Sequence, residues 1–373
     1  MNEETKGIRT WVEVDKQALK YNYDIFRNLI SPKCKLMAVA KSNAYGHCLF
    51  DYAKTMSELG VDWLGVDSVT EAMKLRHSGI KTPILILGHT LAERYQDCSD
   101  NNITITISSF EQIRSLATIH NSQFTIHIKI DTGMHRQGFQ PHEVERAASE
   151  ISDLKNVKVD GIFTHFAAAK NPAFPKETND QINLFVEACA IAKKYFGDNL
   201  VRHAAATSGA LLFPASHFDM VRIGIGLYGI WTSQEAKAFC ESKIDLLPAL
   251  SWKTRIAEVK SIPAGERISY DFTEKLEINT KIGVLPIGYW NGFRRSLSSV
   301  GHVLVNGHRA KVLGRVTMDM IIIDLSSIPT TKVGDEVTLI GENLPVEEMA
   351  EICGTSSYEI LTQLNPLMKR IYK

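Results

Sequence analysis

The sequence predicts an α/β protein in which an eight-stranded parallel (β/α)8 barrel is followed by a C-terminal domain made mostly of β-strands. Eight short apolar runs recur up to about residue 240, and helical patterns lie between most of them. A strand that is buried on both faces reads as a continuous apolar run, as in a barrel enclosed by helices. Beyond residue 240 these helical patterns stop and short strands with turn signals take over. The length of 373 residues also exceeds what one core commonly fills.

The first expected element is an extended segment, Trp11 to Val14, and Asp15 follows it as a candidate helix cap. Apolar residues at helical spacing then indicate the first helix, namely Leu19, Tyr23, Phe26 and Ile30. The eight apolar runs come next: Leu36 to Ala40, Trp63 to Val66, Ile84 to Leu87, Ile103 to Ile107, Phe124 to Ile130, Val159 to Phe163, Val201 to Ala205 and Met220 to Ile225. An open doubly wound sheet is the alternative, but no dinucleotide-type glycine fingerprint follows the first run.

The second domain is indicated by hairpin signals. Asn306-Gly307 separates two short apolar runs, and Gly334-Asp335 stands between Lys332 and the run Val337 to Ile340. We therefore expect a barrel over residues 15–243 and a β domain over residues 244–373, with residues 1–14 as a candidate additional strand of the latter.

Composition excludes several classes of partner. The 42 basic and 42 acidic side chains leave no net charge, so neither a nucleic acid nor an anionic membrane surface is predicted. The six cysteines lack the close spacing of a metal site or redox motif, which favours free thiols in a reducing compartment. The first residues are polar, unlike a signal peptide, and no apolar run reaches the roughly 18 residues of a membrane span. We predict a cytoplasmic protein without a metal.

Lys41 is the first candidate site residue, because it follows the apolar run that ends at Ala40. An ammonium group at the mouth of a buried strand loses hydration, which lowers its pKa and makes the amine a usable nucleophile toward an aldehyde. The alternative is an exposed lysine that merely ends a strand.

Other polar residues lie at or near the strand ends, where barrel enzymes carry their sites. They are Asp131 to Arg136 after the fifth run, Thr164 and His165 after the sixth, Thr207 and Ser208 after the seventh, and Arg222 and Gly224 within the eighth. Each could instead have a purely structural role. Ser208 could cap a helix, His165 could be a hydrogen-bonded histidine at a strand end, and Arg222 could pair with a carboxylate. Together they suit an anionic cofactor, and strands seven and eight are a common phosphate site.

These residues carry a resemblance to the alanine racemases, pyridoxal-phosphate enzymes built from a barrel and a C-terminal β domain. The matching segments fall in family order over essentially the whole chain. They are Ala38 to His47, Asp131 to Met134 with Arg136, Phe163 to His165, Met220 to Tyr228, Ser269-Tyr270, Pro286 to Tyr289, Met318-Asp319 and Tyr358.

The resemblance implies that pyridoxal 5'-phosphate is held by Lys41 as a Schiff base, with Arg222 facing the pyridine nitrogen. Its phosphate would be held by Tyr45, Ser208, Tyr358 and the backbone of Gly224 and Ile225. A guanidinium stays protonated and gives the ring nitrogen no proton, so the ring is a weaker electron sink than a pyridinium.

The resemblance also implies two bases on opposite faces of the substrate. Lys41 would serve the D-amino acid and Tyr270 the L-amino acid, with His165 and Arg222 favouring the phenolate. In the family this tyrosine comes from the other subunit, so a homodimer is implied.

Substrate contacts follow from the same resemblance. Arg136 and the backbone of Met318 would bind the carboxylate of alanine, and the family lysine matching Lys129 is often carbamylated beside that arginine. The remaining entrance residues are Tyr289, Tyr358 and Asp319.

Four positions depart from the usual family pattern: Thr207, Asp271, Thr317 and Cys48. Asp271 matters most, because a carboxylate facing Tyr270 would raise the pKa of that tyrosine. None of the four removes a catalytic group.

The predicted function is therefore interconversion of L-alanine and D-alanine, supplying D-alanine for peptidoglycan. A racemase acting on serine or another amino acid is the alternative. A decarboxylase of the same architecture would place a glutamate where Arg222 stands, and a pyridoxal-phosphate carrier would lack the second domain with Tyr270.

Overall fold

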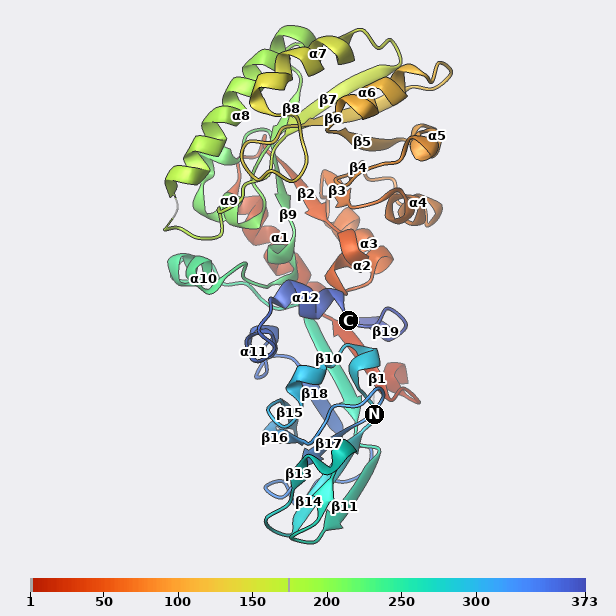
Figure 1. Cartoon of the computed structure of the whole chain (residues 1–373), viewed down its shortest axis with the longest axis vertical. Coiled ribbons are helices and arrows are strands. Elements are labelled where there is room, and N and C mark those ends of the chain that lie inside the picture. Colours follow the sequence, from red (N-terminus) through yellow and green to blue (C-terminus); the bar gives the residue numbers. More distant parts are fainter. Residues whose placement is uncertain (1–2, 174) are drawn as a thin grey trace. The chain divides into compact units, whose positions relative to one another are not determined.

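The computed structural model describes residues 3–173 and 175–373, and the chain divides into two compact units (Figure 1). The barrel unit contains Leu19–Ala44 and Leu49–Leu247. The strand-rich unit contains the chain up to Ala18, the short segment Tyr45–Cys48, and Pro248–Lys373.

The barrel unit is built on eight parallel strands in the order β8-β7-β6-β5-β4-β3-β2-β9. Backbone hydrogen bonds from Arg222 N to Ala205 O (2.9 Å) and from Asp219 N to Arg202 O (3.0 Å) link the remaining edges. The predicted barrel is confirmed, and the open sheet is excluded. The strands are β2 Lys35–Val39, β3 Trp63–Val66, β4 Ile84–Ile86, β5 Ile103–Ile107, β6 Phe124–Lys129, β7 Val157–Phe163, β8 Val201–His203 and β9 Met220–Ile223.

The helices of the barrel alternate with its strands (Figure 1). The first is capped as predicted, because Asp15 Oδ1 accepts the N–H groups of Gln17 (2.7 Å) and Ala18 (3.1 Å). Its apolar side chains at helical spacing are buried. The helices are α1 Lys16–Leu29, α3 Leu49–Leu59, α4 Val69–His77, α5 Tyr95–Asp100, α6 Phe110–Ala117, α7 Val144–Ser152, α8 Pro175–Phe196, α9 Thr207–Leu212 and α10 Gln234–Cys240.

Short 3-10 helices punctuate both units. They are η1 Glu3–Thr5, η2 Ala92–Arg94, η3 Pro141–Glu143, η4 Pro214–Ser216, η5 Ile225–Tyr228, η6 Tyr270–Phe272, η7 Tyr289–Asn291 and η8 Arg295–Leu297.

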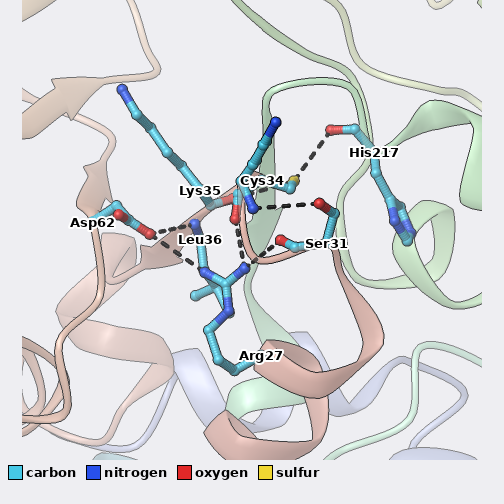
Figure 2. Close-up of polar contacts among 8 residues, drawn as sticks. Arg27, Ser31, Cys34, Lys35, Leu36, Asp62 and His217 are labelled. Atoms are coloured by element: carbon cyan, nitrogen blue, oxygen red, sulfur yellow. Dashed lines mark hydrogen bonds and ion pairs between the residues drawn. The ribbon is translucent and has the colours of Figure 1, made fainter.

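Arg27 fastens the loop that leads from α1 into β2 (Figure 2). Its guanidinium donates to the carbonyls of Ser31 (2.8 Å) and Cys34 (2.6 Å), and it lies 3.6 Å from Asp62 Oδ2. The same carboxylate oxygen accepts the N–H of Leu36 (2.8 Å). These bonds fix the position of the first residues of β2. They therefore also help to fix the position of its C-terminal end, which Lys41 follows.

The strand-rich unit contains a nine-stranded sheet in the order β11-β14-β17-β16-β15-β18-β10-β1-β19. Strand β1 (Thr10–Val14) pairs antiparallel with β10 and parallel with β19, while residues 1–2 lie outside the described chain. The other strands are β10 Leu250–Arg255, β11 Glu258–Ile262, β14 Thr280–Leu285, β15 His302–Val305, β16 His308–Leu313, β17 Ile321–Asp324, β18 Glu336–Ile340 and β19 Lys369–Tyr372. A small ribbon, β12 Arg267–Ile268 with β13 Glu274–Lys275, and helices α11 Val346–Ile352 and α12 Ser357–Thr362 complete the unit.

One of the two predicted hairpins forms. Asn306 and Gly307 have φ of 52° and 80° and join the antiparallel pair β15 and β16, as an Asn-Gly turn of this type should. The hairpin expected at Gly334-Asp335 is wrong. Gly334 does turn the chain (φ 90°), but its N–H donates to Ile256 O (2.8 Å), and β18 pairs with β10 and β15 instead.

All six cysteines are free, as predicted. Among the described residues, no helix combines the length and the apolar character needed to cross a membrane.

Candidate active site

Lys41 stands at the start of a left-handed turn, drawn as α2 (Lys41–Tyr45) in Figure 1. The four residues from Ser42 to Tyr45 have φ of 56°, 55°, 52° and 50°. Left-handed backbone costs roughly 1–2 kcal/mol for each residue with a side chain, or about 4–8 kcal/mol for this turn. Ala44 N donates to Ala40 O (2.8 Å) and closes it. Such stored strain is typical of functional sites, where the surrounding structure must maintain it.

Four cations converge within the barrel unit, and we call them the basic cluster: Lys41, Lys129, Arg136 and Arg222. All four charges act on His165. Burial, followed by the charges of Arg222, Arg136, Lys129 and Lys41, lowers the pKa of His165 to about 3. The imidazole is therefore neutral at physiological pH and can accept a hydrogen bond.

Lys129 is the more buried of the two lysines in the cluster, with 6% of its surface exposed. Burial and then the charges of Arg136, Arg222 and Lys41 lower the pKa of this amine to about 8. Its Nζ donates to Gln137 Oε1 (3.0 Å) and lies 5.4 Å from the ring centre of Phe163. The described chain offers it no carboxylate within ion-pair distance.

Arg222 in β9 is 3% exposed, and burial lowers the pKa of its guanidinium to about 9. It donates to the carbonyl oxygens of Thr164 (2.7 Å), His203 (3.0 Å) and Ala204 (2.9 Å), and it lies 3.2 Å from His165 Nδ1. The carboxylate partner that was its structural alternative is absent from the part of the chain that the structure describes. A buried positive charge without an acidic partner is costly, which favours an anionic ligand.

Two buried histidines extend from Arg222, and the sequence analysis missed both. Arg222 donates to His203 Nδ1 (2.9 Å), so the proton of His203 is on Nε2, from which it reaches His127 Nδ1 (2.8 Å). His127 then carries its proton on Nε2, 4.0 Å from Asp160 Oδ2. Burial lowers the pKa of His127 to about 4 and that of His203 well below its usual value, so both stay neutral. Their signal was a polar residue inside an otherwise apolar run.

Arg136 lies in the loop after β6 and is exposed. Asp131 shapes that loop, since its Oδ1 accepts the N–H groups of Gly133 (3.0 Å) and His135 (2.9 Å). Within the described residues no hydrogen bond or ion pair engages the Arg136 guanidinium. It remains available for a ligand.

The ends of β8 and β9 form a second feature of the barrel unit. Thr207 Oγ1 accepts the N–H groups of Gly224 (3.2 Å) and Gly226 (3.4 Å), which holds this glycine turn and η5, beginning at Ile225, against the start of α9. A Cβ at Gly226 would lie 2.5 Å from Phe26 Cζ, so the backbone approach requires glycine.

The start of α9 carries no side-chain cap, and Ser208 Oγ lies there, donating to Thr232 Oγ1 (2.7 Å). Free N–H groups at a helix start, a hydroxyl and a glycine turn are groups that hold phosphate in proteins. The residues in the barrel unit therefore fit both ends of a phosphorylated, aldehyde-bearing cofactor.

In the strand-rich unit, Tyr45 and Tyr358 lie together, with ring centres 6.0 Å apart. Burial raises the pKa of Tyr358 to about 12, so its hydroxyl keeps its proton. Arg370 Nε donates to Gly46 O (3.0 Å) and Tyr372 donates to His47 O (2.8 Å), which anchors the segment that carries Tyr45.

Tyr270 lies on a separate loop of the same unit and is 69% exposed. Its neighbours Ser269 and Asp271 have φ of 68° and 58°. Asp271 Oδ2 lies 3.0 Å from the Arg315 guanidinium, and Ser269 Oγ accepts the N–H of Arg315 (2.8 Å). The carboxylate that departs from the family pattern is thus neutralised by an arginine.

Tyr289 lies on one loop, and Met318 and Asp319 lie on a second loop that follows Arg315. Backbone hydrogen bonds join the two loops. Tyr289 N donates to Thr317 O (3.0 Å) and Trp290 N to Met318 O (3.0 Å). Large apolar side chains are exposed here, and we call them the apolar loop surface: Tyr270, Phe272, Tyr289, Trp290, Met318 and Met320.

The predicted site residues are therefore brought together in sets within each unit. The structure also offers no metal centre, since no group of three or more His, Cys, Asp or Glu side chains in residues 3–173 and 175–373 could hold an ion.

Comparisons with known proteins agree over the whole chain. Residues 14–231 match the family model described as alanine racemase, N-terminal domain, and residues 249–372 match alanine racemase, C-terminal domain. The alanine racemase of Methanococcus maripaludis is 38% identical over 370 residues, covering 97% of this chain and 98% of the relative. That of Leptospira interrogans serovar Lai is 37% identical over 372 residues, covering 97% and 95%.

Solved structures give the same result. Alanine racemase from Clostridium difficile 630 superposes with a TM-score of 0.93 at 33% identity, covering 98% of this chain and 96% of that one. The enzyme from Bacillus anthracis with bound L-Ala-P has a TM-score of 0.93 at 34% identity, covering 98% and 95%.

Proposed function

The chain belongs to the alanine racemase family, and we propose that it interconverts L-alanine and D-alanine with pyridoxal 5'-phosphate as cofactor. The observation that carries the proposal is the basic cluster, whose four cations meet at a neutral His165. A site with this charge suits a ligand that brings a phosphate and an amino acid that brings a carboxylate.

Lys41 is the proposed covalent attachment point. Tyr45, Ser208, Tyr358 and the backbone at Gly224 and Ile225 are the proposed phosphate ligands. When bound, the cofactor draws electrons from the α-carbon of the amino acid and so acidifies its Cα–H bond. Arg222 would donate to the ring nitrogen, and its pKa of about 9 keeps it protonated at neutral pH.

Proton removal and return require a base on each face of the α-carbon. We assign these roles to Lys41 for D-alanine and to Tyr270 for L-alanine. Arg136 and the backbone of Met318 would bind the substrate carboxylate, since the Arg136 guanidinium has no partner elsewhere in the described chain.

A homodimer is part of the proposal. The apolar loop surface exposes six large apolar side chains, including Tyr270, and grouped apolar side chains of this kind suit a protein–protein contact. Pairing of two subunits through this surface would bury it and deliver Tyr270 to the partner's site. Side chains at Tyr289, Tyr358 and Met318 would then narrow the entrance, with Asp319 beside them, which suits the small methyl group of alanine.

We also propose that the D-alanine serves peptidoglycan synthesis in the cytoplasm. The six free cysteines are consistent with a reducing compartment.

Chiral chromatography of L-alanine incubated with the purified protein and pyridoxal 5'-phosphate tests the activity. L-serine, L-lysine and L-ornithine run alongside, with carbon dioxide release monitored. We expect alanine to reach an equal mixture of enantiomers fastest, without carbon dioxide. Inert alanine beside a reactive second amino acid would overturn the substrate assignment.

Single-turnover exchange of the α-hydrogen in deuterium oxide tests the two bases. Tyr270→Phe should slow exchange of L-alanine more than exchange of D-alanine, whereas Tyr195→Phe, which changes a half-buried tyrosine bonded to Glu145 (3.0 Å), should change neither. Equal loss for both enantiomers in Tyr270→Phe would contradict the assignment.

A further inference from the structure

Glu71 in the first turn of α4 uses both of its carboxylate oxygens on backbone N–H groups. Oε2 accepts the N–H of Asp67 (2.8 Å), in the loop that precedes its own helix. Oε1 accepts the N–H of Ser42 (2.7 Å), the residue directly after Lys41. One side chain therefore ties the end of β3 to the left-handed turn.

Helix α6 shows what the local part of this arrangement requires. There Ser109 caps the helix by accepting the N–H of Gln112 (3.4 Å), and α4 has a serine cap of the same kind. Gln112 Oε1 accepts the N–H of Ser108 (2.9 Å), the residue before the cap. A single amide oxygen thus suffices for the loop. The carboxylate of Glu71 supplies a second acceptor, and that acceptor goes to Ser42.

The bond to Ser42 acts at the peptide that joins this residue to Lys41. Ser42 is the first left-handed residue of the turn (φ 56°), so fixing its N–H fixes the peptide plane from which the Lys41 side chain departs. Asp67 is held by the same carboxylate, and its Oδ1 lies 4.0 Å from Lys41 Nζ. The backbone of Gly88 also lies close to Asp67, since a Cβ at Gly88 would lie 2.3 Å from Asp67 O.

We propose that Glu71 is a positioning residue for Lys41: its carboxylate bridges Ser42 and Asp67 and so fixes both the backbone that carries the lysine and the acid beside its amine. The proposal rests on the proposed role of Lys41 in binding pyridoxal 5'-phosphate. Both carboxylate oxygens of Glu71 are engaged by backbone N–H groups, so Glu71 would act through Lys41 and Asp67.

Glu71→Gln is the informative variant. Gln112 demonstrates that a glutamine at this helix position can serve its own loop, so the change keeps one acceptor and places an NH2 group where Ser42 N needs an oxygen. Glu111→Gln is the matched control, because Glu111 lies in the first turn of α6, is exposed, and pairs with Arg114 (2.7 Å).

Three measurements separate a positioning role from a structural one. They are the dissociation constant of pyridoxal 5'-phosphate by absorbance titration, amide hydrogen exchange across residues 40–46 without cofactor, and the thermal midpoint of the cofactor-free protein. In Glu71→Gln we expect about tenfold weaker cofactor binding, from loss of one charge-assisted hydrogen bond. We also expect faster exchange in residues 40–46, and a thermal midpoint close to that of Glu111→Gln.

Wild-type cofactor affinity together with wild-type exchange in Glu71→Gln would overturn the proposal. So would a lowered thermal midpoint with unchanged affinity, because Glu71 would then only stabilise the fold. If the wild-type protein itself bound no pyridoxal 5'-phosphate, the proposed function would fail, and exchange across residues 40–46 would still decide whether Glu71 holds the turn.

Discussion

Carbamylation of Lys129 is the prediction that the charges of the site support most directly. The pKa of this amine is lowered to about 8 by burial and by three neighbouring cations. At pH 7.5 roughly a quarter of such amines are neutral, compared with about one in 800 for an ordinary lysine with a pKa of 10.4. The neutral amine can attack carbon dioxide, forming a C–N bond and releasing a proton.

The product is an anion, and its surroundings favour it. Conversion of Lys129 replaces one of four cations by a negative charge beside Arg136 and Arg222, so repulsion within the basic cluster becomes attraction. The new carboxylate could orient the unpartnered Arg136 through a charge-assisted hydrogen bond. Lys129→Met should therefore lower kcat/KM for alanine by about tenfold.

Carbon-13 NMR of the protein equilibrated with labelled carbon dioxide measures the modification itself. Dissolved carbon dioxide is held constant while the pH is raised from 6.5 to 8.5, across the pKa of about 8. The neutral fraction then rises from roughly 3% to roughly 75%, and the carbamate resonance should rise with it. A resonance of equal size in Lys129→Met, or none in the wild-type protein at pH 8.5, would refute the reasoning.

Three further predictions concern stability and cofactor binding. Cys48 has φ of 85°, so Cys48→Gly should raise the free energy of unfolding in urea by roughly 0.5–1 kcal/mol, whereas Cys48→Ala, which keeps the strain, should not. Arg27→Met removes two hydrogen bonds to carbonyls and should cost about 2–3 kcal/mol in the same assay. Lys20→Met, which removes an exposed pair, should cost less than about 0.5 kcal/mol, and equal losses would contradict the role of Arg27. Tyr358→Phe should weaken pyridoxal 5'-phosphate binding about tenfold. Because the pKa of Tyr358 is about 12, that difference should stay constant from pH 6 to 10 in absorbance titrations.

The barrel was predictable because its strands are buried on both faces. An apolar run such as Trp63 to Val66 marks such a strand directly, and β3 has those bounds. The order of the strands then follows from the short connections of a parallel barrel. The hairpin at Gly334 failed for the opposite reason. A glycine indicates a local turn but not which strands pair. Strand β18 pairs with β10 and β15, which are distant from it in sequence.

The candidate site was predictable only in part. Lys41 could be predicted because it directly follows an apolar run, at the position where a barrel carries its site. His127 and His203 could not, because their hydrogen bonds to each other and to Arg222 join strands that are distant in sequence. The left-handed turn was also hidden, because Ser42 and Ala44 rarely adopt positive φ, and Asn43, which tolerates it, would at most predict a single left-handed residue.

Two departures from the family pattern have local explanations that a single sequence does not contain. Thr207 offers a hydroxyl to the N–H groups of Gly224 and Gly226, so it organises the glycine turn from the neighbouring strand. Thr317 acts similarly within its own loop, where its hydroxyl donates to Met320 O (2.7 Å). In both cases the partner is a backbone group. Nearly every residue has such groups, so the sequence does not indicate which of them the threonine will bind.

The basic cluster makes the stability of the fold depend on whether an anion is bound. Lys129 and Arg222 are buried, and in the described chain neither faces a carboxylate at ion-pair distance, so their charges oppose folding when no anion is present. The neutral histidines reduce the free-energy cost of burying Arg222, because they offer hydrogen bonds without adding charge. His203 accepts a hydrogen bond from Arg222 and donates one to His127. A ligand that brings negative charge offsets the remainder, and any ligand that binds only the folded state stabilises it. The same buried cations that favour an anionic ligand would therefore make the proposed phosphorylated cofactor part of the stability of the barrel.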